Sequence, residues 1–383
     1  MLRSSPVAVA ATVFVLYGGW VGLAHYHFHH RMTDFAFVGS QFVDRSSASR
    51  AIDADRGAVQ SPLGYDGQFF LYIAQDPRGA VPYIDNPSYR YGRIVYPLLA
   101  RTLALGRQDA IPFMLVAVNV LAVALGTFAL GVVLRRHGQS PWYALIFAAY
   151  PGIFIAVLRD LSEALAYALT ACAVALFDRP GRRGLVSSAA LFAVATLTRE
   201  TAVVFALACA WLLFLRDRSV RRALPFAAGA VLPYVLYRTL FLDQWLGHVG
   251  VPSPLLPTAV PFGGIAHYFP WNDLAIQQVY AIVLPGVFCL ALAGWSLLRR
   301  PDDLGLWALA ANVVAFVVLV PAPVFLDIYA SFRVTAGIVV ALVLAIPALA
   351  ALRPGARAWL WLPVIAWMAA WWTLLPLALQ YTF

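Results

Sequence analysis

The sequence predicts an all-α, polytopic membrane protein. Hydrophobic residues make up 62% of the chain and charged residues only 12%, and apolar runs of membrane-spanning length recur from one end to the other. A helix that crosses the hydrocarbon core needs about 20 apolar residues, and this length predicts about eleven transmembrane helices in one integral-membrane domain, residues 1–383. The expected spans are residues 6–25, 110–134, 141–158, 161–177, 184–198, 200–215, 222–242, 276–298, 304–321, 333–351 and 357–379.

The first of these spans is expected to stay in the protein. The sequence that follows it, HYHFHHR, lacks the small-residue pattern of a signal-peptide cleavage site. The spacing of His25, His27, His29 and His30 fits no recognised zinc-binding pattern. Amphipathic side chains suit the point where a span leaves the membrane, so an interfacial role is favoured over a metal site.

Arginine sets the expected orientation. The 27 basic residues are all arginine, and short loops rich in basic residues face the cytoplasm. Counting alternate loops places Arg135 with Arg136, and Arg299 with Arg300, on the same side, which we expect to be cytoplasmic. The net charge of +9 then reflects membrane insertion and predicts no nucleic-acid partner, because the arginines are scattered among short loops instead of forming a stripe.

Two long segments, residues 26–109 and 243–275, emerge on the extracytoplasmic side in this orientation. The first holds eight of the 18 acidic residues. It also has apolar residues at helical spacing near 66–76 and 92–106, which predicts two helices lying in the membrane interface. The second segment is rich in proline and contains His267. Proline-rich segments resist regular structure, and this one suits either a lid over a binding site or an ordered cap.

The remaining turns on that side are unusually charged. LRDLSEALA contributes Arg159, Asp160 and Glu163, LTRETA contributes Arg199 and Glu200, and FLDIYASFR contributes Asp327 and Arg333. On one helix, the spacing of Arg159, Asp160 and Glu163 would allow contacts along a shared face. Ionisable groups at membrane depth are expensive and usually face a bundle interior or an aqueous cavity. Two interpretations stay open: ion pairs that hold helix ends together, or the walls of a polar cavity open to the outside.

Several of these segments together resemble a known family. YDGQFFLYIAQDP is followed by YRYGRIVYPLLARTLAL, then by DLSEALA after a span and by LTRET before the next. In this combination the chain resembles bacterial integral-membrane proteins that form cell-surface glycopolymers and, more loosely, the GPI mannosyltransferases. Tyr65 and Asp66 stand where the latter carry Trp-Asp, and IVYP at 94–97 stands where they carry Phe-Phe-Pro-x-Tyr-Pro.

The likeness covers roughly residues 60–205. Tyr65 replaces the tryptophan of the looser relatives, and no paired aspartates stand beside Asp66. The resemblance is therefore to the GT-C glycosyltransferase class and indicates no particular sugar.

The resemblance implies a GT-C-like fold, in which a many-helix membrane enzyme has a large first extracytoplasmic loop with interfacial helices and an essential acidic residue. It implies a polyprenyl-phosphate-linked sugar as donor, a glycan or lipid-linked acceptor, and inversion at the anomeric carbon. It also implies a multi-pass protein of the bacterial cytoplasmic (inner) membrane whose active site faces the extracytoplasmic side. The resemblance implies no specific cofactor, and the class allows a divalent cation between Asp66 and a second carboxylate.

Asp66 is the expected catalytic residue. An acceptor hydroxyl loses a proton as it attacks the anomeric carbon, and a carboxylate that takes this proton typically accelerates the reaction about 10²–10⁴-fold. Gly64 and Gly67 permit a tight turn and the close approach of a substrate. The competing interpretation is that an aspartate beside glycine is a turn residue or a helix N-cap.

The leaving group would be a lipid phosphate, which arginine grips well because it keeps its charge and binds oxygens bidentately. We expect Arg93, Arg159 and Arg333 to bind this phosphate, with neutralisation of neighbouring carboxylates as the alternative. Other residues of the loops and charged turns are expected to line the substrate cavity. These are Tyr65, Gln68, Arg90, Tyr96, Asp160, Glu163, Arg199, Glu200 and His267.

The expected function is therefore a membrane glycosyltransferase that uses a polyprenyl-phosphate-linked donor, with Asp66 as general base. One alternative is a transporter or flippase of lipid-linked sugars, but such proteins often show internal repeats and matching interrupted spans, and the sequence shows neither. The other alternative, a non-catalytic scaffold in polysaccharide assembly, leaves the concentration of charge on one membrane face unexplained.

The orientation predicts that both long segments lie outside the cytoplasm. Single cysteines at Ser47 and Thr258, in a variant that lacks Cys172, Cys209 and Cys289, should react with a membrane-impermeant maleimide in intact cells. Labelling of both positions only after lysis would reverse the predicted orientation.

Overall fold

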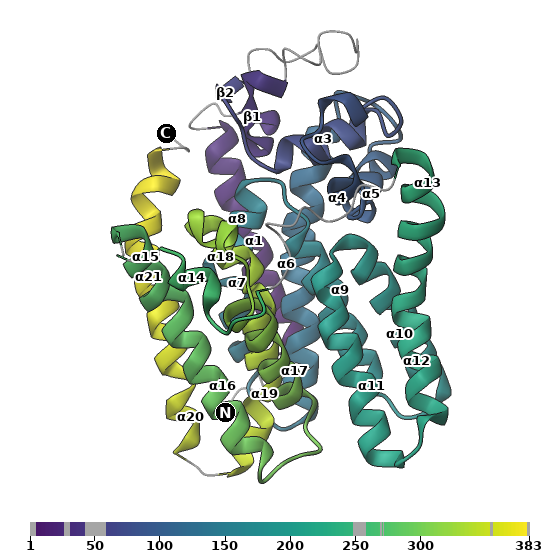
Figure 1. Ribbon diagram of the computed structural model, residues 1–383, viewed down its shortest axis with the longest axis vertical. Coiled ribbons are helices and arrows are strands. Elements are labelled where there is room, and N and C mark those ends of the chain that lie inside the picture. Colours follow the sequence, from purple (N-terminus) through teal and green to yellow (C-terminus); the bar gives the residue numbers. More distant parts are fainter. Residues whose placement is uncertain are drawn as a thin grey trace.

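The described fold is a bundle of helices that run roughly along the long dimension of the molecule (Figure 1). The computed structural model describes residues 5–26, 31–42, 59–247, 258–268, 270, 272–352 and 355–380. After the first long helix, short elements build most of the first loop. They are α1 (Pro6–Tyr26), η1 (Met32–Ala36), β1 (Val38–Gly39), β2 (Val59–Ser61), α3 (Gly67–Gln75), η3 (Val81–Tyr83), α4 (Pro87–Tyr91) and α5 (Val95–Leu103).

The middle of the chain supplies most of the bundle. Its elements are α6 (Ile111–Arg136), η4 (Pro141–Ala144), α7 (Leu145–Ala148), α8 (Pro151–Leu158), α9 (Glu163–Phe177), α10 (Arg182–Thr198), η5 (Glu200–Ala202), α11 (Val203–Asp217), α12 (Val220–Leu236), η6 (Tyr237–Leu242) and α13 (Asp243–Leu246). The last third contributes α14 (Gly263–Ala266), α15 (Asp273–Gln278), η8 (Val279–Val283), α16 (Leu284–Leu297), α17 (Leu304–Val313), η9 (Val314–Val318), η10 (Ala322–Leu326), α18 (Ile328–Val334), α19 (Ala336–Leu352), α20 (Ala356–Trp359) and α21 (Trp361–Gln380).

The prediction of an all-α membrane protein is confirmed. Within the described part of the chain, five helices are long and apolar enough to cross a membrane, and six if one bent pair counts as a span. The five are Pro6–Tyr26, Ile111–Arg136, Val220–Leu246, Asp273–Leu297 and Ile328–Leu352. Every expected span overlaps a helix, but α9 and α11 have only 15 residues each. The total of eleven spans therefore stays a prediction.

The bent pair is α7 and α8, whose axes meet at 57°. Pro151 begins α8 and has no backbone N–H to continue a helix from α7. The residue before it, Tyr150, is extended, with φ −68° and ψ 131°, as expected for a residue that precedes proline. At Gly152 the new helix lies directly against α18, because a Cβ there would be 2.2 Å from the carbonyl oxygen of Phe332.

The two predicted interfacial stretches are occupied by α3 and α5, which lie with α4 and the two strands at one end of the bundle (Figure 1). The strands are short and parallel, with Val38 opposite Val59. The turn between α11 and α12 and the loop after α16 lie at the opposite end (Figure 1). This separation agrees with the alternation of loops used for the orientation, while the membrane side of each end stays a prediction.

Gly67 allows the first loop to pack closely against the bundle. A Cβ at this position would lie 2.0 Å from the carbonyl oxygen of Arg159 and 3.0 Å from that of Ala36. Only glycine allows the start of α3 to approach the turn after α8 this closely. The first loop and the charged turns of the bundle are thereby brought into direct contact.

Candidate functional site

Asp66 occupies the N-cap position of α3 without capping the helix. Its backbone is helical, with φ −56° and ψ −28°, and its side chain makes no capping hydrogen bond. The carboxylate instead binds two arginines: Oδ1 lies 2.8 Å from Arg90 Nη2, and Oδ2 lies 2.9 Å from Arg333 Nη2. Asp66 therefore stands in the turn that precedes α3, as the competing interpretation expected, but its side chain does not cap the helix.

Arg90 brings α4 into the site. Besides Asp66 it binds Asp85, with Nε 2.9 Å from Oδ1 and Nη2 2.8 Å from Oδ2. Its guanidinium lies over the Phe69 ring, 4.8 Å from the centroid. The Nη1 group of this buried side chain has no hydrogen-bond partner among the described residues, so Arg90 retains one unused donor.

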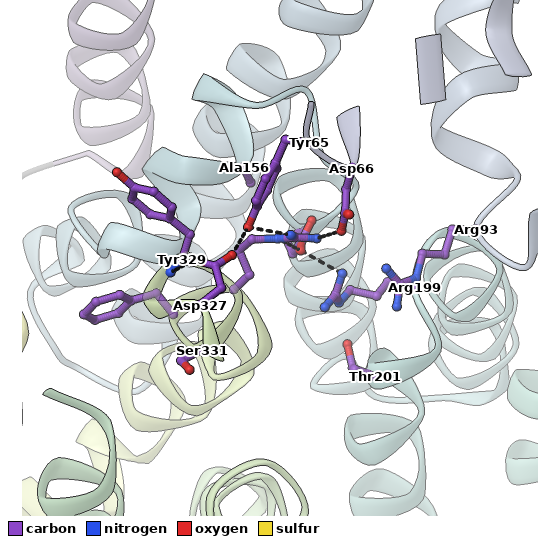
Figure 2. Close-up of polar contacts among 12 residues, drawn as sticks. Tyr65, Asp66, Arg93, Ala156, Arg199, Thr201, Asp327, Tyr329 and Ser331 are labelled. Atoms are coloured by element: carbon purple, nitrogen blue, oxygen red, sulfur yellow. Dashed lines mark hydrogen bonds and ion pairs between the residues drawn. The ribbon is translucent and has the colours of Figure 1, made fainter. Parts of the chain in front are cut away.

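Arg333 is the centre of the site and comes from α18. Its three nitrogens bind three side chains: Nη2 binds Asp66, Nη1 donates to the Tyr65 hydroxyl at 3.1 Å, and Nε binds Glu163 Oε1 at 2.6 Å. The Tyr65 hydroxyl in turn donates to Asp327 Oδ2 at 2.7 Å. Figure 2 shows Tyr65 and Asp66 reaching this centre side by side from the first loop. Three distant parts of the chain are thus joined through one guanidinium.

Glu163, the first residue of α9, is completely buried. Its Oε1 binds both Arg333 Nε and Arg199 Nη1, the latter at 2.7 Å. Its Oε2 has no hydrogen-bond partner in the described part of the chain. A buried carboxylate is tolerated here because two cations compensate its charge.

A second ion pair adjoins the first. Arg93 binds Glu200 with Nε and Nη2, a bidentate contact, and Nη2 also donates to the Tyr89 hydroxyl. The Arg93 guanidinium lies 4.2 Å from the centroid of the Tyr89 ring. Figure 2 shows Arg93 and Arg199 on the opposite side of the centre from Asp327. We call Asp66, Arg90, Arg93, Glu163, Arg199, Glu200 and Arg333 the charge cluster.

Arg159 and Asp160 take different positions from those the sequence suggests. Helix α8 ends at Leu158 and α9 begins at Glu163, so the turn residues and Glu163 share no helical face. The Arg159 guanidinium is buried over the Phe37 ring, 4.0 Å from its centroid. Asp160 adopts a left-handed backbone with φ 47°, which is strained for a residue with a Cβ.

Asp160 is fully buried beside Tyr96 rather than beside an arginine of the charge cluster. Its Oδ1 lies 3.5 Å from the Tyr96 hydroxyl, and its Oδ2 has no hydrogen-bond partner among the described residues. Asn119 Nδ2 donates to the same hydroxyl at 2.8 Å. Burial raises the pKa of Asp160 well above its usual range, which favours the neutral acid at this position.

Two expected cavity residues have other surroundings. The Gln68 amide is buried and binds backbone: Oε1 accepts from Gly39 N at 3.0 Å, and Nε2 donates to Leu63 O at 2.9 Å. These bonds hold the chain just before α3. His267 follows α14, is exposed and meets the Tyr268 ring edge to face at 5.4 Å.

The electrostatics of the cluster are dominated by arginine. Burial alone would raise the pKa of Asp66, but Arg90 and Arg333 outweigh it and hold the pKa well below its ordinary range. Asp66 is therefore ionised at neutral pH. Its side chain keeps 25% of its surface exposed, so a ligand can reach a carboxylate whose partners are nearly buried.

No sequence pattern predicted that Asp85 binds Arg90. The two residues are five apart and Asp85 precedes α4, so helical spacing does not connect them. The local sequence indicates only that a helix starts here, since Asn86 caps α4 and Pro87 is its first residue.

No family model, no curated protein and no solved structure matches this chain. Among the residues that the structure describes, no group of three or more His, Cys, Asp or Glu side chains is arranged to hold a metal ion. Of the four histidines near the end of α1, only His25 belongs to those residues.

Replacing Glu163 tests whether the cluster holds the fold together. Glu163→Gln keeps the shape but leaves Arg199 and Arg333 without their shared anion, so the free energy of unfolding should fall by about 3–5 kcal/mol. Chemical denaturation in detergent micelles measures this change. The control is Asp109→Asn in the exposed pair with Arg107, which should leave stability nearly unchanged. Equal stability of both variants would contradict the account.

Proposed function

We propose that this protein is a membrane glycosyltransferase that moves a sugar from a polyprenyl-phosphate-linked donor to an extracytoplasmic glycan or lipid-linked acceptor. One observation carries the proposal: both oxygens of Asp66 are held by arginines from separate segments, while the carboxylate stays accessible. Such a site offers a base for a hydroxyl and cations for a phosphate. The resemblance of the sequence to GT-C enzymes adds to it.

In the proposed reaction the acceptor hydroxyl gives its proton to Asp66 as its oxygen bonds to the anomeric carbon. The bond from that carbon to the phosphate oxygen breaks, and the polyprenyl phosphate leaves with the electron pair. Fixed cations near the departing oxygen lower the barrier because they stabilise charge that develops there. Arg90 and Arg333 are the arginines in contact with Asp66 and are the proposed phosphate ligands.

This assignment changes the arginines chosen from the sequence. Arg333 is retained, but Arg93 is already held by two contacts with Glu200, and Arg159 lies over Phe37. Arg90 takes their place because it contacts Asp66 and has an unused buried donor at Nη1. Arg93 and Arg159 are then assigned to the support of α4 and of the turn after α8.

A carboxylate with a depressed pKa is a weak base, since catalysis by proton transfer is best when the pKa is near the working pH. In our proposal, binding of the donor raises the pKa of Asp66. A phosphate that draws Arg90 and Arg333 to its own oxygens weakens their contacts with Asp66 and raises its pKa. The base is thereby strengthened only when a donor is bound.

The general-base role predicts the effect of Asp66→Asn. The amide keeps the shape but cannot take the proton, so sugar transfer should fall about 10²–10⁴-fold while donor binding is largely retained. The assay uses purified protein and a polyprenyl-phosphate-linked sugar, with variants matched for thermal stability. The control is Asp85→Asn, which removes the other carboxylate from Arg90 but no base. Near-normal transfer by Asp66→Asn would end the assignment.

Activation by the donor predicts two different pH profiles. In the free enzyme Asp66 loses its charge only below the usual aspartate pKa of about 3.9, so kcat/KM should hold steady down to that pH. In the donor complex the pKa is higher, and kcat should begin to fall at a higher pH than kcat/KM does, because the two quantities report the complex and the free enzyme. Coincident acid limbs would contradict activation by the donor.

A further inference from the structure

An apolar groove lies beside α4, outside the charge cluster. Its volume is about 670 Å³, and its walls come from the loop after α3, from α4 and α5, and from η6 and α13. Its apolar lining includes Tyr91, Leu98, Leu240, Phe241 and Trp245. Volumes of this size are typical of small-molecule sites in proteins.

Aromatic contacts shape the groove. The Tyr237 hydroxyl donates to the carbonyl oxygen of Tyr91 at 3.0 Å, which joins two lining residues from separate segments. The Tyr91 and Trp245 rings meet edge to face at 5.0 Å, and Tyr237 stacks on Phe241 at 5.7 Å. One wall contains a π-helical turn, Tyr237–Leu242. Such turns are rare in proteins overall, but where they occur they are often at functional sites.

Two lining residues of the groove are exposed on a helix that is long and apolar enough to cross a membrane. Leu240 and Phe241 are 58% and 54% exposed, and they belong to the segment Val220–Leu246, which is long and apolar enough to cross a membrane. Apolar side chains exposed on such a helix contact lipid hydrocarbon. A bilayer lipid can therefore enter the groove from the side.

The polar lining of the groove includes one cation. Arg78 lines the groove and is exposed, and its side chain forms no ion pair with a carboxylate of the described residues. Arginine binds phosphate well because its planar group presents several donors. The combination of an apolar wall with one arginine at the rim matches a lipid with an anionic headgroup.

We propose that this groove binds a hydrocarbon chain of an anionic phospholipid from the surrounding bilayer, with the lipid phosphate at Arg78. The sugar donor is a poorer occupant because the reacting groups face elsewhere. Arg90 and Arg93 are turned to Asp66 and Glu200, and neither these side chains nor Asp66 line the groove. The proposal does not depend on the proposed function.

The bound lipid would connect the two walls of the groove. One wall of the groove is η6 with α13, and the other is α4 with α5. Among the described residues, two hydrogen bonds join these walls: the Tyr237 hydroxyl donates to the Tyr91 carbonyl oxygen, and Arg238 Nη2 donates to Ser88 Oγ at the long distance of 3.4 Å. A lipid chain between the walls adds apolar contact where the described protein supplies little, and it supports the helix that presents Arg90 to Asp66.

Thermal unfolding of the intact protein in detergent tests the proposal. Phosphatidylglycerol should raise the melting temperature of the wild type in a saturable way, and phosphatidylcholine with the same chains should raise it less. Leu240→Trp fills the groove and should abolish the saturable shift. Its control is Leu232→Trp, at an exposed position of α12 outside the groove, which should keep the shift.

Arg78→Gln provides a second test that leaves the packing intact. One arginine near an anionic lipid is worth about 1 kcal/mol, so the half-saturating concentration of phosphatidylglycerol should rise about fivefold. Arg107→Gln, at an exposed arginine of the same loop, should leave it unchanged. An undiminished shift in Leu240→Trp would overturn the proposal, as would equal shifts with phosphatidylcholine. A saturable shift with polyprenyl phosphate but not with phosphatidylglycerol would also overturn it and would assign the groove to the donor.

Discussion

Arg333 binds Asp66, Tyr65 and Glu163 at the same time, and the arrangement of the loop end depends on these contacts. A buried guanidinium is tolerated only when carboxylates and hydroxyls satisfy its donors. Arg333 of α18 therefore joins the residues that precede α3 to the first residue of α9. Arg199 binds the other side of Glu163, and the pair of Arg93 with Glu200 extends the same compensation to α4. The approach of Gly67 to the Arg159 carbonyl oxygen brings the first loop close enough for these bonds to form.

The arginines that compensate the charge of Asp66 also determine how basic it is. Asp66 is charged and partly accessible, but its arginines keep it a weak base. A phosphate ligand competes for those arginines, so binding of a donor and activation of the base become one event in our proposal. The competing view, that the cluster only joins helix ends, explains Glu163 well because that side chain is fully buried. It gives no reason for leaving a quarter of the Asp66 side chain exposed.

Much of the fold follows from apolar length, since a long hydrophobic helix has few alternatives to a membrane or a buried core. The position of the charged turns at one end of the bundle was also predictable, because alternate loops of a bundle lie at the same end. It did not reveal which charges pair. Asp66 and Arg333 are 267 residues apart, and helical spacing connects only near neighbours. The contacts suggested for Arg159, Asp160 and Glu163 also assumed one continuous helix. In the structure a turn separates the end of α8 at Leu158 from the start of α9 at Glu163.

A double-mutant cycle on Asp66 and Arg333 measures the energy of their contact and whether a lipid phosphate weakens it. Stability is measured for the wild type, Asp66→Asn, Arg333→Gln and the double variant, each without lipid phosphate and with saturating polyprenyl phosphate. We expect a coupling energy of about 1–3 kcal/mol without ligand, as for side chains that share one network. The coupling should be clearly smaller with ligand, because the phosphate then occupies the arginine. Coupling near zero without ligand, or coupling that polyprenyl phosphate leaves unchanged, would contradict the account.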